Sequence, residues 1–344
     1  MLIYYLIFAL PLAGALSPIR FTSGLRKIPW VILVIATISV IGFRWEIGGD
    51  WPNYYETYLR ISQEGIERAI NNRSIGYGLV NWISSELDFG FVGVNTICAV
   101  LFVSGLAYFC SKQLLPYLAW LVATPYLVVV VSMGYTVQSV ALGFVMVAYQ
   151  LISDRRVVMF FVFVGIATLF HKSAIIVVIC VISVVDKSKL IRLVNKIRYL
   201  SFSKKEWIAL MTVVTVLAVA FVTQSKGILS LIENYIFRDL WESSGGRYRI
   251  LMNAVTGLVF LSIVRLREMD YGGRRLWIYI SIVSLVCVPL VFWQSTLIDR
   301  ISLYFLPLQL HLWSRLPSIF KDPVLRVSSV GFVAFGYAVV LIAW

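Results

Sequence analysis

Charge is scarce in this chain, and negative charge is scarcer still. Of its 344 residues, 14% are charged and 60% are hydrophobic, and 17 Asp and Glu residues stand against 30 Lys and Arg residues. In soluble domains about a quarter of the residues are charged. The composition therefore excludes a soluble globular protein and indicates a membrane protein.

The chain also lacks the motifs of several enzyme classes and of metal sites. It has no P-loop, no HExxH motif, no GxSxG motif and no cluster of acidic residues at metal-binding spacing. Its cysteines show no CxxC spacing and lie in apolar segments, which favours packing over disulfides or metal binding: Cys98, Cys110, Cys180 and Cys287. We therefore expect neither a metal ion nor another cofactor.

What the sequence does contain is a series of long apolar runs. Their continuous apolar character disfavours the alternating strands of a membrane barrel. Because about 20 apolar residues span a bilayer as a helix, we predict an all-α polytopic membrane protein with about 12 transmembrane helices in a single integral membrane domain, residues 1–344. The predicted spans are 2–16, 28–43, 91–110, 114–131, 134–152, 157–170, 173–185, 207–223, 250–264, 276–293, 299–313 and 327–343.

The positions of Lys and Arg predict how these helices are oriented. With the N-terminus outside, two thirds of the basic residues fall in cytoplasmic loops, as the positive-inside rule requires. The densest basic stretch is a cytoplasmic loop at 186–206, and attraction to anionic membrane lipids explains it without a nucleic acid partner. Two larger loops face the periplasm, 44–90 and 224–249, and the amphipathic end of the first predicts an interfacial helix.

The first periplasmic loop begins with an unusually polar segment. Glu46 or Asp50 could act as a general base for a sugar hydroxyl, and Arg44 could bind a phosphate or carboxylate through two hydrogen bonds. Paired glycines let the backbone approach a ligand, and Trp45, Trp51, Tyr54 and Tyr55 offer stacking surface for sugar rings. An aromatic belt at the membrane surface would explain the aromatic residues but not the glycines and carboxylates.

A second polar interruption lies at His171 and Lys172. A single helix through the surrounding apolar run would place the basic loop outside, against the charge rule. The interruption therefore predicts two short helices that meet at the outer side, with these two residues at the tip. His171 could carry a proton or bind an anionic group, or the pair could simply cap a tight helical hairpin.

Charged residues also begin two later spans at the outer side. Cations at a helix N-terminus oppose the helix dipole, so their presence indicates a bound polyanion such as a diphosphate. Arg side chains that reach for the interface, or an Asp–Arg pair that holds two helices together, would explain them equally well. The residues are Arg247, Arg249, Asp299, Arg300 and Tyr304.

Gln138 lies early in another span, within Tyr135-Thr136-Val137-Gln138-Ser139. It could bind sugar hydroxyls, or it could form a hydrogen bond between helices.

Three of these patterns together resemble a known family. They are Arg44-x-Glu46-x-Gly48-Gly49-Asp50-x-x-x-Tyr54-Tyr55, Phe170-His171-Lys172-Ser173-Ala174 and Asp299-Arg300-x-x-x-Tyr304. Their order and spacing are similar to those of the EpsG/Wzy-type polysaccharide (O-antigen) polymerases. The chain departs from that family where Val137-Gln138 stands in place of an Arg-Gln pair.

The resemblance implies a fold, a location and a reaction. The fold would be similar to C-type glycosyltransferases, in the bacterial inner (cytoplasmic) membrane, with an active site that faces the periplasm. The reaction would join oligosaccharide repeat units carried on undecaprenyl diphosphate into O-antigen, capsule or exopolysaccharide. The lipid-linked oligosaccharide would be both donor and acceptor, without a nucleotide sugar, and a Wzz-like co-polymerase that regulates chain length would be a further partner.

The resemblance also divides the polar residues between two tasks. The acceptor hydroxyl needs a base, for which the candidates are Asp50, Glu46 and His171. The leaving diphosphate needs positive charge, for which the candidates are Arg247, Arg249 and Arg300, with Arg44 or Lys172 assisting. Stabilisation of the charge that develops on a leaving group is usually the largest contribution to catalysis.

Three other functions remain open at this point. An O-antigen ligase would use a different acceptor. A flippase or other transporter of lipid-linked oligosaccharide would need charged groups through the bilayer midplane, whereas the charges here cluster at one face. A membrane acyltransferase with His171 as base would need a donor that arrives from the cytosol.

Overall fold

The computed structural model describes residues 2–17, 27–183, 246–264, 271–292 and 295–343. Throughout this part of the chain, secondary structure is helical and no strand is present, which confirms the predicted all-α class. Three predicted segments lie wholly or mainly outside the described residues: the basic loop at 186–206, the span at 207–223 and most of the loop at 224–249.

The helices form two compact units. The first unit comprises Met1–Met146, Leu169–His171 and Gln309–Trp344, and the second comprises Val147–Thr168 and Lys172–Leu308. The chain therefore passes from one unit to the other within a helix, within the residues around His171, and again near Gln309.

The first unit contains several helices that pack against one another. α1 (Leu2–Leu16) packs against α2 (Ile28–Gly42), α6 (Pro116–Ala123) and α16 (Pro323–Ala343), and α2 packs along α5 (Gly90–Ser111). α5 also meets α8 (Thr136–Ser153), and a Cβ at Gly105 would collide with the Gly143 backbone. Glycine at both positions therefore lets these two helix backbones come into direct contact.

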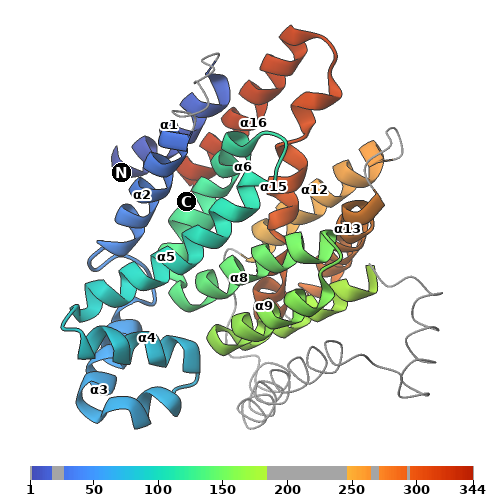
Figure 1. The fold of residues 1–344 in the computed structure, drawn as a ribbon. Coiled ribbons are helices and arrows are strands. Elements are labelled where there is room, and N and C mark those ends of the chain that lie inside the picture. The colour runs from blue at the N-terminus through green and yellow to red at the C-terminus, as the bar shows by residue number, and fades with distance from the viewer. Residues whose placement is uncertain (1, 18–26, 184–245, 265–270, 293–294, 344) are drawn as a thin grey trace, which may run out of the picture. The chain divides into compact units, whose positions relative to one another are not determined.

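The first predicted periplasmic loop folds into two helices. α3 (Trp51–Ile70) and α4 (Ile75–Glu86) pack side by side, and α4 also packs against α5, near the end where α5 begins (Figure 1). α3 has a non-helical residue, Gly65, at φ +73° with open space around it. The predicted interfacial segment falls in α4, which buries Tyr77 and Asn81, and its depth in a membrane stays a prediction.

One span of the first unit contains an unusual helical stretch. α6 continues through a π-helical segment, η2 (Thr124–Val131), into α7 (Ser132–Gly134). Pro125 has no amide hydrogen to donate to the preceding turn, which favours a local departure from α-helical hydrogen bonding. The helix then ends at Tyr135, whose backbone is non-helical (φ −127°, ψ 60°), and α8 begins at the next residue.

In the second unit, three α-helices and a 3₁₀ helix pack together. α12 (Gly246–Val264) packs against α13 (Tyr271–Leu290) and α14 (Ser295–Ser302), and the 3₁₀ helix η3 (Lys172–Ser183) packs against α13 and α14. α9 (Val157–Phe170) precedes η3 in the chain, and its last residues belong to the first unit.

Five described helices are long and apolar enough to cross a membrane. Shorter apolar helices lie at four further predicted spans, Leu2–Leu16, Ile28–Gly42, Val157–Phe170 and Lys172–Val181. These helices fit a membrane protein, and the total of about 12 spans stays a prediction. The five long helices are Gly90–Ser111, Pro116–Gly134, Thr136–Ser153, Gly273–Leu290 and Pro323–Ala343.

The segment predicted as a span at 299–313 differs from a continuous helix. It is divided into the end of α14, the short 3₁₀ helix η5 (Leu303–Phe305) and α15 (Pro307–Trp313). Pro307 lacks the amide hydrogen that would continue the helix from η5, which explains the break at this position. A short 3₁₀ turn, η6 (Leu316–Ile319), follows α15.

Candidate functional site

The polar segment after α2 is fastened to the start of α8 by Arg44. Its side chain is buried, with Nη1 donating to the carbonyl oxygen of Ile41 at 2.9 Å and Nη2 donating to Oγ1 of Thr136 at 2.5 Å. A cation beside the last carbonyls of α2 is also favoured by the helix dipole. Arg44 therefore ties the end of α2 to the start of α8.

Gly48 makes a second contact between the same two regions. It adopts φ +110°, and a Cβ there would collide with the carbonyl oxygen of Met133. Only glycine combines this backbone conformation with so close an approach. The segment from Arg44 to Asp50 thus lies directly on the break between α7 and α8.

Tyr54 provides the third contact. The backbone N–H of Val137 donates to its hydroxyl, and its ring meets Tyr77 edge to face at 5.3 Å between centroids. Burial, followed by the nearby Asp50 carboxylate, raises the pKa of Tyr54, so the phenol stays protonated. Gln138, the predicted sugar-binding residue of α8, is buried and follows Val137 directly.

The electrostatic surroundings of Arg44 are unusual for a buried cation. Burial lowers its pKa, and the groups that offset this effect are the thiol of Cys98 and the hydroxyls of Tyr77, Tyr54 and Tyr4. Among the described residues, none of the ion pairs involves Arg44. A desolvated charge without an ionic partner is costly, so this residue requires an explanation beyond packing.

The two predicted carboxylates occupy different environments. Glu46 is exposed and adopts φ +53°, a left-handed conformation that non-glycine residues rarely adopt. Asp50 is half-buried, precedes the first turn of α3 and lies near Tyr54. Because the chain is not helical from Glu46 to Asp50, the two do not share a helix face, but the helix dipole favours a negative charge at Asp50.

Tyr55 belongs to a separate aromatic cluster. It stacks on Trp51 with 5.2 Å between centroids and an interplanar angle of 13°, and it meets Trp45 and Phe91 edge to face. Trp45 is half exposed and also meets Trp51. The two successive tyrosines of α3 therefore lie in different environments. Tyr54 lies near Arg44, and Tyr55 lies in an aromatic cluster.

The predicted helix break at His171 is confirmed. α9 ends at Phe170, His171 is non-helical, and η3 begins at Lys172. The Phe170 ring stacks on Phe144 of α8 at 5.8 Å and lies against Gly76, the residue before Tyr77. His171 is thus attached to the part of the first unit that also carries Tyr77, and its place at the tip of a hairpin stays a prediction.

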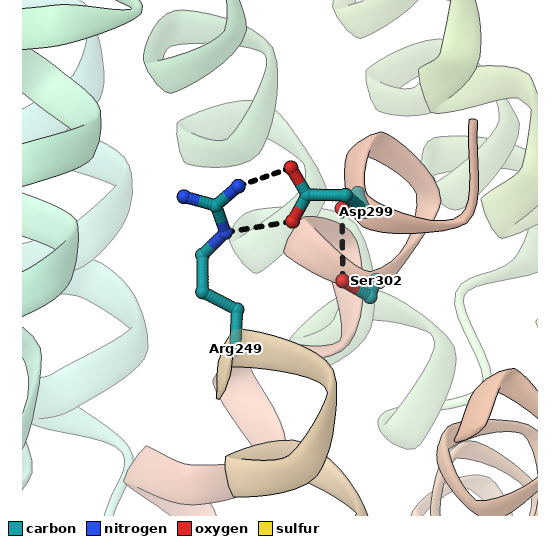
Figure 2. A network of polar contacts seen from close by, with 3 residues as sticks. All are labelled: Arg249, Asp299 and Ser302. Carbon is teal, nitrogen blue, oxygen red and sulfur yellow. Dashed lines mark hydrogen bonds and ion pairs between the residues drawn. The ribbon is translucent and has the colours of Figure 1, made fainter. Parts of the chain in front are cut away.

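In the second unit, Arg249 and Asp299 form a buried ion pair between α12 and α14. Nε of Arg249 donates to Oδ1 of Asp299 at 2.6 Å, and Nη2 donates to Oδ2 (Figure 2). Oγ of Ser302 donates to the carbonyl oxygen of Asp299 at 2.8 Å, and Asn253 donates to the carbonyl oxygen of Ser302 at 2.9 Å. This geometry matches the alternative in which an Asp–Arg pair holds two helices together.

The other predicted cations of this unit have different neighbours. Arg247 is exposed and lies over the ring of Phe292, 5.9 Å from its centroid. Arg300 is half-buried and interacts electrostatically with Tyr304. Arg247 thus lies over an aromatic ring, Arg249 pairs with Asp299, and Arg300 interacts with Tyr304.

Tyr304 is fully buried in the second unit. Its carbonyl oxygen accepts a hydrogen bond from the Tyr149 hydroxyl at 2.9 Å, and its own hydroxyl accepts one from Ser173 at 3.5 Å. Lys172 precedes Ser173, so the second and third predicted motifs meet at this tyrosine.

The predicted site residues did not include three that contact Arg44 or interact with it electrostatically, Thr136, Tyr77 and Cys98. Thr136 accepts its hydrogen bond, Tyr77 and Cys98 face it, and Asn81 and Asn95 lie one helical turn from those two. The sequence signal for the two asparagines was that each is a polar amide within a largely apolar helix. In the described segments, no group of three or more His, Cys, Asp or Glu residues is placed to hold a metal ion.

Comparison with known proteins gives one match. A family model described as the EpsG family matches residues 27–344, which include the residues of both units discussed above. No curated protein and no solved structure matches the chain.

Proposed function

Because this chain belongs to the EpsG family and is a polysaccharide polymerase-like membrane protein, we propose that it joins undecaprenyl-diphosphate-linked oligosaccharide repeat units by glycosyl transfer at the periplasmic face. The observation that carries the proposal is the attachment of the Arg44–Asp50 segment to the start of α8 through Arg44, Gly48 and Tyr54. It positions a carboxylate, a phenol and a buried cation together.

The transfer requires a base at the acceptor. A hydroxyl of the incoming lipid-linked unit loses its proton, its oxygen bonds to the anomeric carbon of the growing chain, and the bond from that carbon to the diphosphate breaks. Asp50 is our preferred base because it lies near Tyr54, at the start of α3. Glu46, exposed on the same segment, and His171 are the alternatives.

The leaving undecaprenyl diphosphate requires positive charge. Arg249 is already neutralised by Asp299, which makes it the weakest of the candidates. Arg44 forms no ion pair with another described residue, Arg300 interacts electrostatically with Tyr304, and Lys172 directly precedes Ser173, which contacts Tyr304. The exposed aromatic surface around Trp45 and Tyr55 is suited to stack against sugar rings of the acceptor.

The proposal is tested by comparing surface polysaccharide ladders from cells with and without the gene. We expect single repeat units in its absence. Attached chains missing altogether would indicate a ligase, and an unchanged ladder would overturn the proposal.

The same assay tests the base. The Asp50→Asn variant should restore no long chains although the protein accumulates normally. A matched control is Glu56→Gln, which changes an exposed acid of α3 that pairs with Arg60 and should restore the ladder. Long chains from Asp50→Asn, with their loss in Glu46→Gln or His171→Ala, would move the role to that residue.

A further inference from the structure

In the second unit, the last residues of α8 pack against the first residues of α13. The rings of Tyr149 and Trp277 meet at 5.9 Å between centroids, with 62° between their planes. One turn closer to both helix ends, a Cβ at Gly273 would lie 3.8 Å from Oγ of Ser153. Because these two contacts follow one another along both helices, the residues after Ser153 lie close to the start of α13.

Four arginines gather at this place, and we call them the basic junction. Arg155 and Arg156 follow α8, and Arg274 and Arg275 lie near the start of α13. Arg274 is half-buried and the other three are exposed. In the described stretches 147–160 and 271–290, the sole acidic residue is Asp154. The two stretches therefore carry a clear excess of positive charge.

The loop before α13 does not remove this excess. Residues 265–270 contain two basic and two acidic side chains, so their charges balance. They lie outside the described residues, and the junction is defined without them.

The basic junction is unfavourable for the protein by itself. Arg155 adopts φ +59°, a left-handed conformation in which a helix end usually has glycine. Its N–H donates to the carbonyl oxygen of Ile152 at 3.0 Å, and the N–H of Arg156 donates to that of Leu151 at 2.8 Å. The dipole of α8 favours cations at its end, but the dipole of α13 opposes them at its start. An anion held between the two helices would offset this opposition and the mutual repulsion of the arginines.

An exposed apolar face of α13 begins at the basic junction. Tyr279, Ile282 and Val286 follow Arg275 at intervals of four, three and four residues, which places all four on one side of the helix. These three side chains are 43%, 46% and 51% exposed. The face thus presents a cation, then a tyrosine and then aliphatic side chains. A phospholipid presents its headgroup, its interfacial region and its acyl chains in the same order.

The apolar face distinguishes a lipid from other anions. A free phosphate or an acidic protein segment would use the arginines, but neither would need the aliphatic side chains beyond them. Two helices that are long and apolar enough to cross a membrane end and begin here, Thr136–Ser153 and Gly273–Leu290. The positive-inside rule predicts that this end faces the cytoplasm, where the membrane surface carries negative charge.

We propose that the basic junction binds the phosphate group of an anionic phospholipid, whose acyl chains lie along Tyr279, Ile282 and Val286. The guanidinium group suits this task, because it donates two parallel hydrogen bonds to phosphate oxygens, which only accept. A bound lipid would fasten the end of α8 to the start of α13. This inference goes beyond the proposed function and does not depend on it.

The test titrates the full purified chain in detergent micelles with phosphatidylglycerol and counts the bound lipid by mass spectrometry of the intact complex. Phosphatidylcholine, which carries no net charge, and inorganic phosphate, which lacks acyl chains, are the comparison ligands. The double variant Arg155→Gln/Arg275→Gln removes one exposed charge from each helix. It should weaken the affinity for phosphatidylglycerol by about tenfold or more, because each basic residue near an anionic headgroup contributes to binding.

A second variant, Arg155→Gly, separates lipid binding from folding. Glycine adopts the left-handed conformation without strain, so the melting temperature of the lipid-free protein should rise. The affinity for phosphatidylglycerol should nevertheless fall. The charge-matched control is Lys112→Gln/Lys321→Gln, which removes two exposed cations of the first unit. This control should bind phosphatidylglycerol as the parent protein does.

Four results would overturn the inference. Parental affinity in Arg155→Gln/Arg275→Gln would show that the junction does not hold the lipid. An equal loss in the lysine control would show that net charge alone attracts it. Equal binding of phosphatidylcholine would show that the negative charge is not recognised. Displacement of the lipid by an equal concentration of inorganic phosphate, or of an oligoglutamate peptide, would assign the junction to a free anion or to an acidic protein segment.

Discussion

Arg44 in the first unit and Arg249 in the second are equally buried, at 4% exposure each, yet their partners differ completely. Arg249 meets both oxygens of Asp299, so its charge is neutralised within the fold. Arg44 meets a carbonyl and a hydroxyl, and its Nε has no hydrogen-bond partner among the described residues. The charge of Arg249 is thus neutralised by a carboxylate between two helices, whereas Arg44 is held by neutral hydrogen-bond partners at the end of α2 and the start of α8.

The largest expected effect comes from breaking the pair in the second unit. Asp299→Leu removes the carboxylate that pairs with the buried Arg249 and should destabilise the protein by about 3–5 kcal/mol. The measurement is the melting temperature of the purified protein. Adding Arg249→Met to this variant should restore most of the loss, and the double variant should still produce polymer for each folded molecule.

If the double variant regains its melting temperature but produces no polymer, the purely structural role given to Arg249 is wrong. This result would show that Arg249 acts on the substrate as well as on the fold.

A smaller effect is expected from Gly48→Ala in the first unit. A Cβ would collide with the Met133 carbonyl at a backbone angle that alanine disfavours, at a cost of about 3 kcal/mol or displacement of the segment. Polymer should be lost even where the protein accumulates. Gly49→Ala is the control, because nothing lies within 4 Å of its Cβ and its φ is not positive.

Equal polymer from both glycine variants would show that the attachment of this segment to Met133 is not required. The attachment of the Arg44–Asp50 segment would then depend on the contacts of Arg44 and Tyr54.

The smallest effect is expected from Thr136→Val. It removes the hydroxyl that accepts from Arg44 and should cost roughly 1–2 kcal/mol in stability. Thr136→Ser keeps the hydroxyl and should behave as the parent protein does. If valine and serine give the same melting temperature and the same polymer, Thr136 does not position Arg44.

The local features of this fold were predictable from the sequence, because apolar length and polar interruptions are themselves local. The helix break at His171 and the polar segment from Arg44 follow directly from such interruptions. The division of 299–313 was missed because its length and its many apolar residues suggested one span, although Pro307 was the available signal.

The partners of the charged residues could not be predicted in the same way. Arg44 and Thr136 are 92 positions apart, and Arg249 and Asp299 are 50 apart. No local pattern relates residues at such separations, because only the packing of the helices decides which side chains meet. The sequence therefore left an ion pair and a ligand-binding cation as equal alternatives for Arg249 and Asp299.

The non-helical residue in α3 gives a practical access point to the protein. At Gly65 the helix is already interrupted on an exposed stretch with free space around it, and exposed interruptions of this kind accept inserted sequence best. An epitope or a protease site placed there should leave the contacts of Arg44 and Tyr54 intact. Such a tagged protein would report directly, in intact cells, on which side of the membrane this segment lies.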